Sequence, residues 1–445
     1  MRIRPAFSFF TGAFYFLLTI NARLLLAQPV ADTTIISENP EPVIESAIIK
    51  EAVNTRNLKT IQLGRSDLEL AYPVILLNSE DELLFSFDDL RGGVVNYYYT
   101  FQHCNQNWEP SNLTYFDYLD GFEENRFDDY QFSFGTSQHY THYSVSFPND
   151  DVDFKMSGNY ILKIWEEDDR DTPVIVKRFF VWEELAIVSA TVFRPNIIEY
   201  RNEFQELSFN VNIKNTGISN PFDEIRVTAM QNGRFDNARY DLKPRMITND
   251  MLYYDNDANV FPAGKEYRRF DTKTLHFQSD RIRKIEKDDA GYQVYINVDE
   301  SRIYQKYFYE KDINGQFVIQ ADIVNDINTE GDYAWMHFVL QYPYFITSGE
   351  FYVFGNLTNQ LMNNENKMEY DFDLQQYSVN LYLKQGYYNY LYGFKSAGSE
   401  IAEFNFAEGN FYETENDYQV LVYQHVYDRG YDRLIGCSFF NSLKK

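Results

Sequence analysis

Short apolar runs that end in turn residues are the feature that most constrains this chain. Runs such as ELLFSFDDL, VVNYYYTFQHC, YTHYSVSF and GNYILKIWE alternate partly between apolar and polar residues, and Gly, Pro, Asn and Asp separate them. The chain contains 37 Tyr and 38 Phe but only 21 Gly. Aromatic and β-branched residues suit a half-buried pleated surface, and short strands at such spacing are typical of antiparallel sandwiches. The sequence therefore predicts an all-β fold of tandem immunoglobulin-like, early-set sandwiches.

The grouping of these runs predicts three sandwiches. A first set of runs ends at Trp182 and Glu183, a second opens with AIVSATVFRP, and a third begins near Asp332. The predicted ranges of the three sandwiches are 57–183, 184–325 and 326–445. Residues 28–56 contain prolines without a sustained period, and we expect a linker or a loosely attached lead-in strand there. Little helix is expected beyond the stretch NLTYFDYLDG.

The first 27 residues have the pattern of a secretory signal peptide. Arg2 and Arg4 precede an apolar run from Pro5 to Ile20, and the segment closes with LLLAQ. The run is too short and too poorly flanked for a transmembrane anchor. We expect cleavage after Ala27, and no cysteine follows at which a lipid could be attached. The sequence therefore predicts an exported, soluble mature protein.

The net charge narrows the classes of partner. The formal net charge is −26 at pH 7. Nucleic-acid binding depends on neutralising phosphates with Lys and Arg, so an acidic chain is poorly suited to it. An anionic membrane surface is disfavoured for the same reason. The charge leaves a basic protein surface or cations as the partners to consider.

The histidines and cysteines do not form a recognisable catalytic or metal site. His103 and Cys104 are adjacent on a predicted strand and therefore point to opposite faces, which argues against a nucleophile–base pair. Cys104 is expected to be a buried small hydrophobe, and a bridge to Cys437 remains possible. His139 and His142 are three apart, so on a strand they also face opposite ways. We predict no metal and no catalytic residue here.

Acidic residues offer two further patterns, and neither indicates a site. A glycosidase needs two opposed carboxyls, one of them with a raised pKa. The acids of one short segment are instead expected to form a solvated loop; they are Asp117, Asp120, Glu123, Glu124, Asp128 and Asp129. The loop DNDAN at 255–259, with Glu266 in the twelfth place, has Val260 where an EF-hand needs Gly. We therefore predict no bound ion and no cofactor.

The third set of runs resembles a carbohydrate-binding fold. EFYVFGNLTNQ and KMEYDFDLQQYSVNLYLKQGYYNYLYGF are similar to the glycogen-binding sandwich of early-set type. In that family, tryptophans on the sandwich stack on sugar, whereas the matching loop here has Leu357, Asn359 and Leu361. The resemblance implies the fold, but the absence of these tryptophans argues against carbohydrate binding. A carbohydrate-binding multi-sandwich protein, or a glycan-processing accessory protein, remains the alternative.

A more specific resemblance covers the first set of runs. The ordered segments ELAYPVILLNSEDELLFSFDDL, VNYYYTFQHCNQNW, YLDGFEENRFDDYQFSF, SGNYILKIWE and VIVKRFFVWE resemble the first domain of the type IX secretion system plug family, from about residue 58 to residue 183. FNVNIKNTGISNP and VTAMQNGRFDNA are similar to the family's second part. The resemblance implies a non-enzymatic periplasmic protein that binds the large outer-membrane translocon barrel and closes its periplasmic mouth. It implies no insertion into the membrane and no nucleic-acid partner.

A contact loop with such a partner is expected in the segment YLDGFEENRFDDY. Tyr118 and Phe122 are its candidate anchors, because aromatic residues are enriched among binding hot spots. Gly121 is expected to allow a tight backbone turn, and the rim would consist of Asp120, Glu123 and Glu124. The alternative is that Tyr118 and Phe122 only cap the sandwich core.

Overall fold

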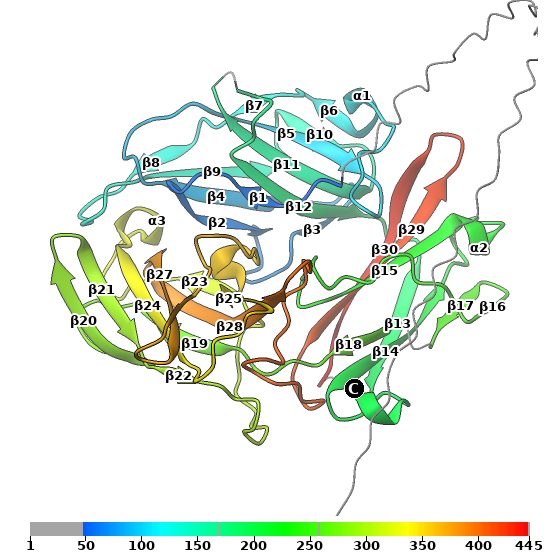
Figure 1. The fold of residues 1–445 in the computed structure, drawn as a ribbon. Coiled ribbons are helices and arrows are strands. Elements are labelled where there is room, and N and C mark those ends of the chain that lie inside the picture. Colours follow the sequence, from blue (N-terminus) through cyan, green and yellow to red (C-terminus); the bar gives the residue numbers. More distant parts are fainter. Residues whose placement is uncertain (1–47, 168, 256–258, 444–445) are drawn as a thin grey trace, which may run out of the picture. The chain divides into compact units, whose positions relative to one another are not determined.

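The apolar runs of the first predicted sandwich each form a strand with side chains that face a core, and the all-β prediction is confirmed. The runs TLHFQS at 274–279 and QKYFYE at 305–310, which also suggested strands, are not strands. The computed structural model describes residues 48–443 except 168 and 256–258, and these belong to one compact unit, Ser46–Lys445. The predicted signal peptide, 1–27, and residues 28–47 of the predicted linker lie outside the described residues. Figure 1 shows three pairs of sheets. Among the described helices, none has the length and apolarity needed to cross a membrane.

The first sandwich has a sheet in the order β1-β12-β11-β5-β7, with β3 added beside β12, and a facing sheet in the order β2-β4-β9-β8. A small sheet pairs β10 with β6. Its elements are β1 (Ala52–Val53), β2 (Leu58–Arg65), β3 (Val74–Leu76), β4 (Leu83–Asp89), β5 (Tyr97–Cys104), α1 (Tyr115–Tyr118), β6 (Leu119–Gly121), β7 (Asn125–Arg126), β8 (Tyr130–Phe132), β9 (Thr141–Phe147), β10 (Val152–Phe154), β11 (Gly158–Glu166) and β12 (Ile175–Trp182).

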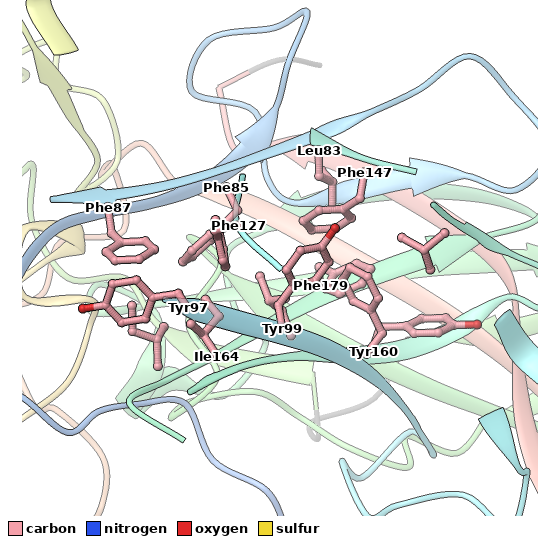
Figure 2. Close-up of a cluster of buried hydrophobic side chains, with 14 of the residues drawn as sticks. Leu83, Phe85, Phe87, Tyr97, Tyr99, Phe127, Phe147, Tyr160, Ile164 and Phe179 are labelled. Carbon is pink, nitrogen blue, oxygen red and sulfur yellow. The ribbon is translucent and has the colours of Figure 1, made fainter. Parts of the chain in front are cut away.

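Aromatic rings fill the space between these two sheets. Figure 2 shows Phe85 and Phe87 of β4 pointing toward Tyr97 and Tyr99 of β5. The rings of Phe87 and Tyr97 meet edge to face with centroids 4.9 Å apart, an arrangement that aromatic quadrupoles favour. The aromatic richness of the sequence is therefore used first to build cores.

The middle sandwich has one sheet in the order β13-β14-β17-β16, with β18 beside β14, and a second in the order β15-β29-β30. Its elements are β13 (Ile187–Phe193), the 3₁₀ turn η1 (Ile198–Tyr200), β14 (Phe204–Asn212), α2 (Pro221–Glu224), β15 (Ile225–Gln231), β16 (Met246–Thr248), β17 (Met251–Tyr254), β18 (Val260–Pro262), β29 (Asp417–Val426) and β30 (Tyr431–Asn441).

The third sandwich has one sheet in the order β19-β28-β23, with β25 beside β28, and a second in the order β20-β21-β24-β27-β26, with β22 beside β24. Its elements are β19 (Arg268–Asp271), β20 (Ile282–Asp288), β21 (Gly291–Ile296), β22 (Asp299–Glu300), β23 (Phe317–Ile319), α3 (Ile327–Glu330), β24 (Tyr333–Gln341), β25 (Gly349–Phe354), the 3₁₀ turn η3 (Asn356–Thr358), β26 (Glu369–Asp371), β27 (Gln376–Lys384) and β28 (Gly386–Ser396).

The sheets cross the predicted limits of the second and third sandwiches, 184–325 and 326–445. The last hairpin, β29–β30, pairs with β15 and so belongs to the middle sandwich. Conversely, β19 pairs with β28 and belongs to the third sandwich. The reason lies in β29, whose two faces are both buried: Val420 and Val422 pack in the middle core, and Leu421 packs against the first sandwich.

Buried contacts join the sandwiches. An apolar cluster between the first and middle sandwiches comprises Val74, Cys104, Trp108, Ile161, Val176, Phe180, Met230, Leu421, Tyr423, Leu434 and Cys437. Between the first and third sandwiches, the Nζ of Lys384 lies 2.8 Å from an Oδ2 of Asp88, and both side chains are almost fully buried.

The described end of the predicted linker, residues 48–56, is a docked edge strand. β1 pairs antiparallel with β12, so that Ala52 lies opposite Val176. The backbone N–H of Asn54 also donates to the carbonyl of Val174 at 2.9 Å. Of the two readings of this segment, the lead-in strand is the correct one for these residues.

Candidate functional site

The predicted contact loop begins with the single-turn helix α1. Thr114 caps this turn, because its backbone N–H and its hydroxyl both donate to Asp117 Oδ2, at 2.8 and 2.7 Å. These two hydrogen bonds hold the pKa of Asp117 below its usual value. A Thr followed three residues later by an acid is a local signal for a helix start, and it sets the direction of the chain into β6.

Tyr118 lies in the core of the first sandwich. Its side chain is 7% exposed, and its hydroxyl donates to the carbonyl of Phe101 at 3.1 Å. Its ring packs edge to face on Tyr160. Burial raises the pKa of Tyr118 to about 12. A partner cannot reach this ring, so the structure favours the core-cap alternative for Tyr118.

Gly121 makes a turn that no other residue can make without strain. Its φ is +109°, and a Cβ at this position would lie 2.0 Å from the carbonyl oxygen of Asp151. The close approach arises because β6 pairs with β10, with Gly121 opposite Val152. The next N–H, of Phe122, donates to that same carbonyl at 3.0 Å. The sequence-based role of Gly121 in a tight backbone turn agrees with this geometry.

Phe122 and the acidic residues lie on the outside of this turn. The side chain of Phe122 is 65% exposed, and Asp120 is exposed beside it. Glu123 and Glu124 both form ion pairs with Arg170. These pairs are largely exposed, so each contributes roughly 0–1 kcal/mol. The turn therefore presents one large apolar side chain within an acidic rim.

Sequence reasoning missed two residues of this region. Phe116, on α1, is 67% exposed; it lies in the stretch NLTYFDYLDG, where a helix was expected, but it was not named as a contact residue. Arg429, in the turn between β29 and β30, donates to Asp117 Oδ1 at 2.6 Å. Phe116 lies two positions before the buried Tyr118, and residues two apart in a helix face different sides. This spacing is a signal by which the exposure of Phe116 could have been predicted. The contact of Arg429 spans 312 positions and has no local signal.

His103 and Cys104 do not cooperate. The His103 ring is buried, with Nδ1 2.9 Å from Ser111 Oγ and Nε2 3.2 Å from the Ser157 carbonyl. Burial lowers the pKa of His103 to about 4 and raises the pKa of Cys104 to about 12. Cys104 and Cys437 are both free and buried. Because neighbouring strand residues face opposite ways, His103 packs in the first core while Cys104 packs against the middle sandwich.

The other candidate ligands are separated in the same way. His142 is buried and its Nδ1 lies 2.7 Å from Asp88 Oδ1, whereas His139 is exposed. The acids Asp128 and Asp129 are exposed. Across the described residues, no three His, Cys, Asp or Glu side chains converge so that they could hold a metal ion.

The described acids of the EF-hand-like segment, Asp255 and Glu266, have separate partners. Residues 256–258 lie outside the described residues, while Asp255 forms an ion pair with Arg245 and Val260 lies in β18. Glu266 is buried and accepts a hydrogen bond from the Tyr307 hydroxyl. Burial raises the pKa of Glu266 to about 7.

The loop that resembles a sugar-binding loop is used for packing. Leu357 lies in η3 and packs against the third core. Asn359 and Leu361 are half-buried. Trp108 and Trp165 are buried, and Trp182 and Trp335 are half-buried. No tryptophan is therefore presented on this loop.

Comparisons with known proteins agree with the resemblance seen in the sequence. Residues 58–183 match the family described as the type 9 secretion system plug protein 1st domain. A crystal structure of a hypothetical protein from Parabacteroides merdae ATCC 43184 is similar, with 35% sequence identity and a TM-score of 0.85, over 88% of this chain and 98% of that one.

A structure of manganese lipoxygenase of Gaeumannomyces graminis with part of a zonadhesin of Komagataella pastoris covers 87% of this chain and 94% of that one at 9% identity. Its TM-score of 0.14 supports no structural likeness. Among curated proteins, none matches the chain.

Proposed function

The chain belongs to the type IX secretion system plug protein family, and from this premise we propose that it is a periplasmic, non-enzymatic plug. It binds the outer-membrane translocon barrel and closes the periplasmic mouth of that barrel while no substrate is being exported. The observation that carries the proposal is the match of residues 58–183, which span β2 to β12 of the first sandwich, to the plug family's first domain.

The state of the reactive side chains supports a role without catalysis. The Cys104 thiol has a pKa raised to about 12 by burial, so it is not ionised near neutral pH and is a poor nucleophile. His103 is held neutral and hydrogen-bonded on both ring nitrogens. Glu266 has a raised pKa but lies at an internal contact with Tyr307. Each of these groups is used inside the fold.

The arrangement of exposed aromatic rings favours a protein partner over a sugar. Flat sugar platforms use coplanar rings beside polar groups, with tryptophan most often supplying the ring. Rings at the surface of the third sandwich are tilted instead: the exposed Phe345 and Phe372 meet at 53°, and the half-buried Tyr370 meets Phe372 at 86°. The large exposed aromatic side chains of the described chain are Phe and Tyr, without a tryptophan among them.

Purification of the barrel from native membranes tests the proposal. The barrel is isolated through an affinity tag from cells that contain this chain, and the periplasmic fraction is also prepared from a strain that lacks the barrel. We expect this chain to co-elute with the barrel in one-to-one amounts, and to be recovered from the periplasmic fraction when the barrel is absent. A barrel that is isolated intact without this chain, from cells that contain it, would contradict the proposal.

A further inference from the structure

Four large aromatic side chains stand out from loops of the first and middle sandwiches. We call them the aromatic crest: Phe116 (67% exposed), Phe122 (65%), Phe222 (63%) and Tyr427 (64%). Phe116 lies in α1, Phe122 in the turn after β6, Phe222 in α2 and Tyr427 in the turn between β29 and β30. Apolar side chains this exposed, gathered in one region of an acidic protein, are a mark of an interaction site.

Side-chain hydrogen bonds bring these loops together. Arg429 Nη2 donates to Asp117 Oδ1 at 2.6 Å and so joins the β29–β30 turn to α1. In the same turn, the Tyr427 hydroxyl donates to the carbonyl of Asp223 in α2 at 3.2 Å. The β29–β30 turn is therefore the centre of the crest, with α1 on one side of it and α2 on the other.

Hydrogen bonds to neighbouring residues fix the loops of the crest. Lys155 Nζ donates to the carbonyl of Phe116 at 2.7 Å. Gln424 Nε2 donates to Glu224 Oε2 at 3.3 Å and ties β29 to α2. The N–H of Phe122 is bound to the carbonyl of Asp151. A surface whose backbone is fixed before binding loses little conformational freedom on docking, which favours affinity.

The charges around the crest indicate which kind of partner can bind there. Asp120 and Asp428 are exposed next to Phe122 and Tyr427. Of the nearby cations, Arg170 and Arg429 form ion pairs with carboxylates of this chain, and Lys155 Nζ is bound to the carbonyl of Phe116. An acidic rim is repelled by an anionic lipid surface and is complementary to a protein surface that carries Lys and Arg.

We propose that the aromatic crest is the surface by which this chain docks on the translocon barrel, and the inference rests on the proposed function. Its occupant is a protein surface of the barrel that offers apolar pockets for the crest rings and basic side chains around them. The aromatic rings supply the binding energy, while the acidic rim mainly raises the rate of encounter.

The crest is a composite of two sandwiches. Its parts come from residues 116 to 427 of the chain, and the buried apolar cluster between the two sandwiches holds them together. At the crest itself, the ion pair between Arg429 and Asp117 fixes the β29–β30 turn on α1. Weakening that link should therefore loosen binding even though neither residue is itself an aromatic anchor.

The test uses purified full-length chain and purified barrel in detergent, with the dissociation constant as the readout. Two variants remove the crest on either sandwich, Phe116→Ala with Phe122→Ala, and Phe222→Ala with Tyr427→Ala. A matched control, Phe372→Ala with Leu374→Ala, removes side chains that are 70% and 59% exposed on the third sandwich.

We expect each crest variant to bind about thirtyfold more weakly or worse, since a hot-spot truncation costs roughly 2 kcal/mol and each 1.4 kcal/mol is tenfold. Melting temperatures should stay near that of the unchanged protein, because the removed rings are exposed. The control should bind normally.

A charge pair tests the composite nature of the crest. Arg429→Glu, which places a carboxylate beside Asp117 and leaves the Thr114–Asp117 cap intact, should weaken binding, whereas Arg429→Lys should retain most of it. Binding by Arg429→Glu equal to that of the unchanged protein would mean that the two sandwiches do not act together.

The outcomes separate the inference from the proposed function. If the unchanged protein binds the barrel and the crest variants bind equally well, the crest is not the docking surface and the plug function stands. If the unchanged protein does not bind the barrel, the proposed function fails and the inference with it. Crest variants that lose self-association, or lose binding to anionic phospholipid vesicles, while keeping the barrel, would assign the crest to a second copy or to lipid and overturn the proposal.

Discussion

Replacing Lys384 by Met should uncouple the first sandwich from the third. The ammonium of Lys384 lies 2.8 Å from Asp88 Oδ2, and the two side chains are 1% and 0% exposed. Lys384 also donates to the carbonyl of Asn328 at 2.7 Å. Burial lowers the pKa of Lys384, and the attraction of Asp88 opposes that shift. Met fills the same volume but leaves the Asp88 carboxylate without its cation.

The loss of stability depends on the hydrogen bonds that Asp88 retains in the variant. Removing one partner of a buried ion pair costs about 3–5 kcal/mol, because a buried charge is left uncompensated. Asp88 still accepts a hydrogen bond from the Tyr333 hydroxyl at 2.6 Å and lies 2.7 Å from His142 Nδ1. We therefore expect about 3 kcal/mol, at the lower end of that range.

Urea unfolding followed by circular dichroism measures this cost. The matched control is the double variant Asp88→Asn with Lys384→Met, which removes both charges while the Asn oxygen still accepts from Tyr333. It should recover at least half of the lost stability, since a neutral buried pair has no uncompensated charge. A Lys384→Met variant that loses under about 1 kcal/mol, or a double variant no more stable than the single one, would refute the reasoning.

Three further predictions follow from single sites. Gly121→Ala should destabilise the protein by about 2 kcal/mol or more, because its φ of +109° is strained for Ala and its Cβ would meet the Asp151 carbonyl; Gly135→Ala, at φ +73° with nothing within 4 Å, should cost clearly less in the same thermal melt. The pKa of Glu266 is about 7 in the folded state against an ordinary value of 4.5. The protonated carboxyl therefore favours the folded state at low pH, and this stability is lost as the pH rises from 4.5 to 7. Glu266→Gln should flatten this part of the stability–pH curve, and an unchanged slope would contradict the assignment. The buried Cys104 thiol should react with a thiol reagent only at the rate of unfolding, and fast labelling of the native protein would show that it is accessible.

The strands were predictable because their signal is local. Alternation in ELLFSFDDL and YTHYSVSF sets both the strand and its buried face, and the structure places Phe85 and Phe87 inward accordingly. The sheet to which a strand belongs has no such local signal, because it depends on pairing with distant segments. β29 follows β28 in the chain but pairs with β15, which lies nearly 200 positions earlier. Its near-continuous apolar run, YQVLVY, is the signal of a strand buried on both faces that could have suggested this.

In the candidate site, too, the features with a local sequence signal could be predicted and those that depend on tertiary contacts could not. The tight backbone turn expected at Gly121 is present, and the residue has a positive φ there; its part in a partner contact stays a prediction. Tyr118 and Phe122 looked equivalent as aromatic residues of one loop, yet one is 7% and the other 65% exposed. Their difference depends on the end of α1, which turns Tyr118 toward the core. Phe222 and Tyr427 join the same region only through tertiary contacts, so no spacing rule could have found them.

Conductance of the purified barrel in a planar bilayer tests the central claim most directly. The barrel is first stripped of this chain, and the purified chain is then added to the periplasmic side. The account predicts large open-channel conductance that falls to near zero as the chain binds, with the same dissociation constant as in the binding assay. Conductance that stays high while the chain is bound would show that it associates with the barrel without closing it, and would contradict the account.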